Sequence, residues 1–154
     1  MWDGGSKKCV HQNKNYPSDK LQFSDASQSS THSNRYFAEN AINGNGGVTY
    51  TKDTSAPWWE GTVAQSYITE VVVDLYFDCS YIFKVYDSDG TEKFKSVVTS
   101  VKKDKRYSLP RILEVYSVGS KIRIEKIEPG ILSLQQVTAN GVTTDRLHGL
   151  QNVM

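Results

Sequence analysis

The sequence has few cysteines, no long apolar run and almost no net charge. Its two cysteines, Cys9 and Cys79, lie far apart, so they can form one disulfide in an oxidising compartment or remain two thiols. No segment is apolar over the length that a membrane-spanning helix needs. With 18 basic and 17 acidic residues, the formal net charge is +1, which gives no general attraction to nucleic acids or anionic membranes.

The usual motifs of catalysis are also missing. The three histidines, His11, His32 and His148, have no neighbours at metal-ligand spacing, and no Cys-x-x-Cys pair occurs. There is neither the Gly-x-Ser-x-Gly motif of serine hydrolases nor a phosphate-binding glycine loop. We therefore expect a binding protein and not an enzyme.

Alternation of apolar and polar residues is the strongest pattern that is present. It runs through residues 67–77, 81–85 and 121–125, as in strands that bury one face of an antiparallel sheet. No segment has a sustained apolar stripe at helical spacing, and only residues 35–42 could form a short helical turn. For the first strand we expect one buried face, made of Tyr67, Val71, Val73, Leu75 and Phe77.

Turn signals separate these strands. Asp87-Ser88-Asp89-Gly90 predicts a hairpin because Asp-Gly accepts the positive φ angles of a tight turn, and Pro129-Gly130 predicts a second turn. Short strands joined by regular turns indicate an all-β, antiparallel β-sandwich of the jelly-roll type. The length of 154 residues suits one core, so we expect an N-terminal arm over residues 1–20 and a single domain over residues 21–154.

Three sequence segments carry a family resemblance. They are Ala26-Ser27-Gln28-Ser29-Ser30 with 40–45, Pro57-Trp58-Trp59-Glu60 with 67–71, and Leu132-Ser133-Leu134-Gln135-Gln136-Val137. In this order they resemble the signatures of F-type (fucose-binding) lectins, whose galactose-binding-domain-like jelly roll is shared with discoidin-like domains. The resemblance covers residues 21–142. It implies a lectin-like, carbohydrate-binding module with a glycan or glycoprotein partner, cell adhesion, and an extracellular or cell-surface location.

The resemblance also implies a structural calcium ion, held in the family by two Asn, an Asp and a Cys-Glu pair. Asn40 and Asn45 match this pattern, Asn43 replaces the Asp, and Gln135 and Gln136 replace the Cys-Glu pair. Calcium affinity depends on ligand charge, and two carboxylates are lost. We therefore expect a weak or vestigial calcium site at Asn40, Asn43, Asn45 and Gln136, or amide hydrogen bonds that close the loop without metal.

The sugar site of the family departs further from its pattern here. Family members hold fucose with a His from the loop before the double Trp, an Arg-x-Asp segment and a later Arg. In this sequence Tyr50 or Lys52 would replace the His, Tyr76 stands at the Arg position, Asp78 and the following Cys match, and Lys84 lies near the last Arg position. We therefore predict an altered or weakened site made of Tyr50, Lys52, Tyr76, Asp78 and Lys84. The alternative is a protein-interaction or structural module that has lost sugar binding.

The double tryptophan has two interpretations. Adjacent residues of a strand point to opposite sides, so one of Trp58 and Trp59 is expected in the core while the other can be exposed. An exposed indole ring could stack on a sugar, whereas a covered ring would support the nearby loops.

Overall fold

The computed structural model describes residues 18–100 and 110–145, and its regular secondary structure there is almost entirely strand. In chain order the elements are β1 (Asp19–Lys20), β2 (Phe23–Gln28), the 3-10 helix η2 (Ala38–Ala41), β3 (Trp58–Leu75), β4 (Tyr81–Tyr86), β5 (Glu92–Val98), β6 (Arg111–Lys126) and β7 (Leu134–Thr143). Every pair of neighbouring strands is antiparallel. The all-β prediction is confirmed, and η2 falls inside the predicted helical turn. Of the predicted arm, residues 1–17, with Cys9, lie outside the described residues.

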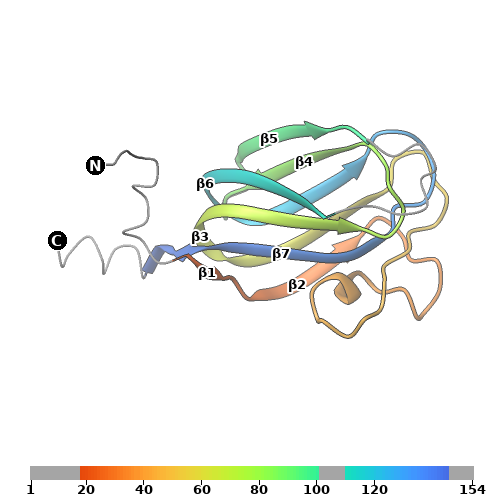
Figure 1. Ribbon diagram of the computed structural model, residues 1–154, viewed down its shortest axis with the longest axis horizontal. Coiled ribbons are helices and arrows are strands. Elements are labelled where there is room, and N and C mark those ends of the chain that lie inside the picture. Colours follow the sequence, from red (N-terminus) through yellow and green to blue (C-terminus); the bar gives the residue numbers. More distant parts are fainter. Residues whose placement is uncertain (1–17, 101–109, 146–154) are drawn as a thin grey trace, which may run out of the picture.

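Two long strands, β3 and β6, run through both layers of the sandwich (Figure 1). The first half of β3 pairs with β2 and with the end of β6, which also pairs with β4, and β4 pairs with β5. The second half of β3 pairs with β7 and with the beginning of β6, and β7 pairs with β1. A register shift between Thr62 and Ser66 separates the two halves. The predicted antiparallel sandwich is thus built from one folded-over sheet.

Gly119 lies where β6 changes layer, and its lack of a side chain is necessary there. A Cβ atom at this position would lie 2.2 Å from Cγ1 of Val85 and 3.2 Å from the carbonyl oxygen of Tyr86. Any larger residue would therefore push β6 away from β4, at a cost of about 1–3 kcal/mol by overpacking.

The predicted buried face of β3 is partly wrong because β3 contains a second register shift, between Ile68 and Glu70. Val71, Val73 and Leu75 are buried as expected, but N-terminal to the shift the buried residue is Ile68 and Tyr67 is only half-buried. An extra residue in a strand reverses which side chains face the core. Phe77 lies beyond the end of β3 and is 37% exposed.

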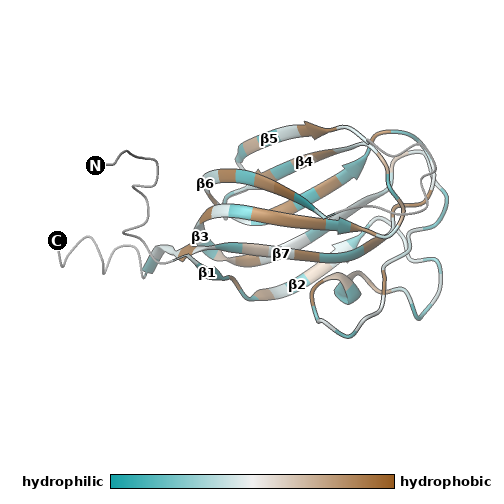
Figure 2. Cartoon of the chain, in the orientation of Figure 1, coloured by the Kyte–Doolittle hydropathy of each residue, from teal (hydrophilic) through white to brown (hydrophobic). Residues whose placement is uncertain are grey.

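The core lies between the two layers, and apolar residues alternate along the strands that line it (Figure 2). Its largest fully buried side chains include Trp59, Tyr81, Phe83, Ile68, Ile122 and Ile124. The inward faces predicted for residues 81–85 and 121–125 are confirmed.

The connections divide between the two ends of the sandwich (Figure 1). Residues 87–91 form the predicted hairpin turn at one end, with Gly90 at φ +91° and its N–H donating to the carbonyl of Asp87 over 3.0 Å. The longer connections, including residues 29–57 with η2, lie at the opposite end, which we call the rim. Gly130, in the second predicted turn, has a φ of +142°. Within the described residues, no helix is long and apolar enough to cross a membrane.

Candidate functional site

Five aromatic side chains gather at the rim. Tyr50 lies at the centre of this group, which we call the rim aromatic cluster: His32, Tyr36, Tyr50, Tyr76 and Phe77. The ring of Tyr50 stacks on Tyr36 at 4.4 Å between centroids and on Phe77 at 5.7 Å. His32 lies 6.0 Å and Tyr76 lies 6.2 Å from the same ring. The rings come from the β2–β3 connection, on both sides of η2, and from the β3–β4 connection, so the cluster exists only in the folded chain.

Two buried threonines fix the position of Tyr50. The N–H groups of Thr49 and Thr51 donate to the carbonyls of Leu134 and Leu132, over 2.9 and 3.1 Å. In return, the two leucine N–H groups each donate over 2.9 Å to a threonine hydroxyl. Because both threonines are fully buried and successive side chains of an extended segment alternate, Tyr50 is directed away from the core.

Backbone hydrogen bonds bring the other rings to Tyr50. The N–H of His32 donates to the Tyr50 carbonyl over 2.9 Å, and the N–H of Tyr50 donates to the Tyr36 carbonyl over 3.4 Å. On the other side, the N–H of Tyr76 donates to the carbonyl of Ser133 over 2.9 Å.

The cluster combines covered and accessible rings. Tyr76 is 41% exposed and Phe77 is 37% exposed, whereas Tyr50 is half-buried. Burial raises the pKa of Tyr50, and the neighbouring Tyr76 and Tyr36 raise that pKa further. The Tyr50 hydroxyl therefore keeps its proton and can donate a hydrogen bond throughout the physiological pH range. Such a surface offers apolar ring faces together with hydroxyl groups.

The structure brings two of the five predicted ligand residues, Tyr50 and Tyr76, into ring contact. Lys52 is exposed, two residues beyond Tyr50, and its N–H donates to the hydroxyl of Ser30 over 2.9 Å. Asp78 follows directly after the cluster and accepts a hydrogen bond from Ser100. Together with the buried Cys79, Asp78 lines a small hollow of about 300 Å³.

Lys84 lies instead in the middle of β4, within a group of ion pairs on the face of the sheet. Its ammonium nitrogen is 3.4 Å from a carboxylate oxygen of Glu125 and 3.9 Å from one of Glu92. Burial acts to lower the pKa of Lys84, but the charge of Glu125 outweighs it and the pKa is raised. Within the described residues, 18–100 and 110–145, Lys84 makes no contact with the rim aromatic cluster. Its role in ligand binding stays a prediction.

Sequence reasoning missed His32, Tyr36 and Phe77. The family pattern predicts a histidine between residues 48 and 54. His32 lies instead between β2 and η2, and its backbone N–H reaches Tyr50 through a hydrogen bond. The alternation of apolar residues predicts Phe77 on a strand face, whereas β3 ends at Leu75. The available signal was the high tyrosine count, nine residues, several of which lie outside the alternating segments.

The asparagine loop is closed by its own amides. The buried Asn40 side chain donates to the carbonyls of Arg35 and Val48 over 3.0 and 2.9 Å, and its oxygen accepts from Asn45 over 3.4 Å. The Asn43 oxygen accepts the N–H of Asn45, and the Asn45 oxygen accepts the N–H of Gly47.

These three asparagine oxygens are thus engaged within the loop, and none of them carries charge. Gln136 is exposed on β7 and donates to Thr138 over 3.4 Å; within the described parts of the chain it has no hydrogen bond to the loop. A calcium ion requires several oxygens that converge on one point, preferably with negative charge. As they are placed, these residues do not fit a calcium ion.

The double tryptophan divides as predicted. Trp59 is fully buried, and its indole N–H donates to the carbonyl of Ala38 in η2 over 3.0 Å. Trp58 is half-buried on the opposite face, where the guanidinium of Arg123 covers its ring at 4.4 Å. Both rings support the structure around them.

Several solved structures have a similar fold. A fucose-binding module of Streptococcus pneumoniae, SpX-3, is 26% identical and matches 75% of this chain and 91% of its own, with a TM-score of 0.65. A His mutant of the lectin-binding domain of lectinolysin, complexed with Lewis b, is 19% identical over 77% of this chain and 92% of its own, with a TM-score of 0.65. A fucolectin from the serum of Morone saxatilis (striped bass) is 22% identical over 77% of this chain and 45% of its own, with a TM-score of 0.64.

No protein-family model and no curated protein matches the sequence. The structural similarities nevertheless confirm the fold expected from the three sequence segments. The fold of this chain is an antiparallel β-sandwich similar to that of fucose-binding lectin modules, from which its sequence has diverged.

Proposed function

We propose that the chain is a non-catalytic carbohydrate-binding module that holds a sugar on the rim aromatic cluster. The observation that carries this proposal is the arrangement of four rings around Tyr50, with Tyr76 and Phe77 accessible to solvent. Exposed aromatic side chains on loops that a rigid sandwich supports are typical of ligand-binding surfaces. Similar folds occur in a fucose-binding module and in a lectinolysin domain complexed with Lewis b, which supports the same class of ligand.

The site differs from the family pattern in charge, and we infer that its specificity differs as well. Rings and hydroxyl groups dominate the cluster, while the cation Lys52 and the carboxylate Asp78 lie beside it. We therefore expect binding to depend on stacking against an apolar sugar face more than on cationic hydrogen-bond donors. The ligands would be neutral glycans of glycoproteins at a cell surface or outside the cell.

A glycan array with the purified chain, with and without calcium, tests this function. We expect one or more neutral glycans to bind in both conditions. For the best ligand, Tyr76→Ala should weaken binding at least about tenfold, because it removes an accessible stacking surface. The matched control is Tyr116→Ala, which removes a tyrosine that is 46% exposed on β6 and lies outside the cluster. An array without any bound glycan, or equal weakening by both substitutions, would contradict the proposal.

A protein-interaction module is the second candidate, because an apolar side chain outside the rim aromatic cluster is also exposed on a strand. Ile112 is 65% exposed on β6, next to the half-buried Val72 of β3. Crosslinking in a native extract, with free monosaccharides as competitors, separates the two functions. A partner that sugars do not displace and that Ile112→Asp abolishes would favour this candidate.

A further inference from the structure

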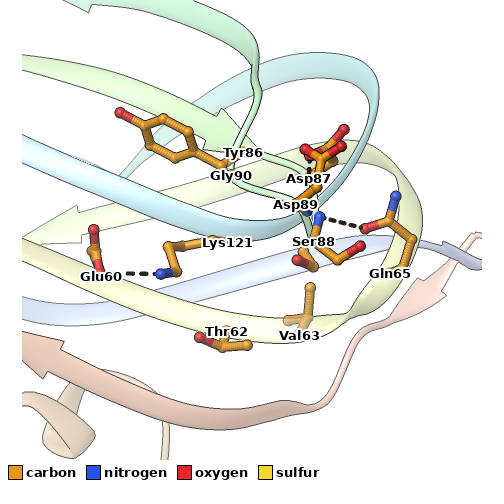
Figure 3. Close-up of a pocket in the computed structure, with 11 residues that line it drawn as sticks. Glu60, Thr62, Val63, Gln65, Tyr86, Asp87, Ser88, Asp89, Gly90 and Lys121 are labelled. Carbon is orange, nitrogen blue, oxygen red and sulfur yellow. Dashed lines mark hydrogen bonds and ion pairs between the residues drawn. The ribbon is translucent and has the colours of Figure 1, made fainter.

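A second hollow lies at the hairpin end of the sandwich, away from the rim. Its volume is about 770 Å³, within the range of pockets that hold small ligands. Figure 3 shows that its walls come from β3, from β6 and from the hairpin between β4 and β5. We consider six of the residues that line it: Glu60, Gln65, Tyr86, Ser88, Asp89 and Lys121.

This hollow is separate from the rim aromatic cluster. β4 begins at Tyr81, four residues after Phe77, and ends at Tyr86, which lines the hollow. At about 3.3 Å per residue, β4 alone separates its two ends by about 17 Å. A ligand in the hollow would therefore use a different set of side chains from a sugar at the rim.

The floor of the hollow is held in place by hydrogen bonds and ion pairs (Figure 3). The N–H of Ser88 donates to the side-chain oxygen of Gln65 over 3.1 Å, which fixes the hairpin against β3. Glu60 forms an ion pair with Arg123 and lies 3.8 Å from the ammonium nitrogen of Lys121. The walls are thus arranged before any ligand arrives, which reduces the entropy lost on binding.

The walls offer both hydrogen-bond donors and acceptors. The NH2 group of Gln65 has no partner within residues 18–100 and 110–145, and the distance from Lys121 to Glu60 leaves that ammonium group able to donate. Asp89 accepts from Thr91 through one carboxylate oxygen, and the side chain of Asp87 lies beside the same carboxylate group. Tyr86 contributes a half-buried ring and a hydroxyl group.

This combination determines the class of ligand. Hydroxyl groups both donate and accept, so a polyhydroxylated molecule can satisfy ammonium, amide and carboxylate groups together. An anion would meet more carboxylates than ammonium groups on these walls. We propose that the hairpin hollow is a second saccharide-binding site, in which the ring of Tyr86 faces the sugar and Gln65, Asp89 and Lys121 bind its hydroxyl groups.

NMR titration of the ¹⁵N-labelled full chain tests this proposal. The probes are L-fucose, D-galactose, D-glucose and N-acetylglucosamine, with sodium sulfate and lysine as charged comparisons. We expect at least one sugar to shift the amide signals of Gln65, Ser88 and Lys121. These shifts should persist in a Tyr50→Ala/Tyr76→Ala variant, so the hollow is tested independently of the rim and of the function proposed for it.

Substitutions in the hollow assign the binding groups. Gln65→Glu keeps the oxygen that accepts from Ser88 but removes the NH2 donor, and should weaken sugar binding about 3- to 10-fold. Tyr86→Ala should weaken it at least about tenfold. Gln22→Glu, which adds the same charge at an exposed position between β1 and β2, should leave it unchanged.

The proposal is overturned if none of the four sugars shifts these signals, or if only sulfate or lysine does so. It is also overturned if the shifts disappear in the rim variant, or if Gln65→Glu and Gln22→Glu have the same effect on affinity.

Discussion

At the scale of single residues, Arg123 organises the outer face of the sheet that contains β4. Its guanidinium pairs with Glu60 and Glu125 and covers the ring of Trp58, while Glu125 also pairs with Lys84. The double tryptophan and the alternation in residues 121–125 predicted which faces of the strands are buried. They could not predict this ion-pair group, because its members come from three strands whose register is fixed only by the fold.

The pKa of Glu125 gives a prediction about acid stability. Burial acts to raise this pKa, but the hydrogen bond from Arg123 and the charge of Lys84 lower it more, so in the folded chain it lies below its usual 4.5. A carboxyl with a lowered folded-state pKa stabilises the fold above its unfolded pKa, and this contribution is lost as the pH falls through the folded value. We therefore expect the free energy of unfolding to fall more steeply below about pH 4.5 for the wild type than for Glu125→Gln.

Urea unfolding between about pH 7 and about pH 3 measures the difference in the free energy of unfolding between the wild type and Glu125→Gln. This difference should reach about 0.5–1.5 kcal/mol at about pH 7. Glu114→Gln, an exposed carboxyl on β6, serves as the control. Parallel pH curves for wild type and Glu125→Gln would show that the Arg123 and Lys84 contacts do not stabilise the carboxylate.

At the scale of elements, the hairpin and the short strands were predictable because their signals are local. Asp87–Gly90 contains its whole turn, and Tyr81–Val85 keeps one phase of alternation from end to end. β3 was harder, since two register shifts change the phase within its 18 residues. The rim cluster was harder still, because hydrogen bonds between distant segments assemble it.

The asparagine loop is the element whose closure can be tested directly. Asn40 is 7% exposed and donates to two carbonyls, so Asn40→Ala leaves buried acceptors without partners and should cost about 1–3 kcal/mol of stability. The exposed Asn34→Ala is the matched control.

Thermal unfolding with added calcium and with a chelator should give equal midpoints for the wild type, because amide hydrogen bonds close the loop. A midpoint that rises with calcium would show that the loop binds the ion.

At the scale of the whole molecule, β3 and β6 link the two layers covalently and through hydrogen bonds. Each contributes strand pairs to both layers, and Trp59 and Ile124 of one layer share a core with Val71 and Val73 of the other. Neither layer can bury its apolar face alone, so the layers should lose their structure together.

We therefore expect one cooperative unfolding transition in urea. The transition followed by tryptophan fluorescence should coincide with the transition followed by far-ultraviolet circular dichroism. Two separate midpoints would mean that one layer survives the loss of the other, contrary to the continuity of β3 and β6.

The hydrogen bond from the Trp59 indole to the Ala38 carbonyl has a practical consequence for experiments on this protein. It connects a chromophore in the interior to the short helix that precedes the asparagine loop. Indole emission is sensitive to the loss of such a bond, so a ligand that displaces η2 would alter the intrinsic spectrum without any attached dye. Intrinsic tryptophan fluorescence can therefore report movements of the loops around the rim.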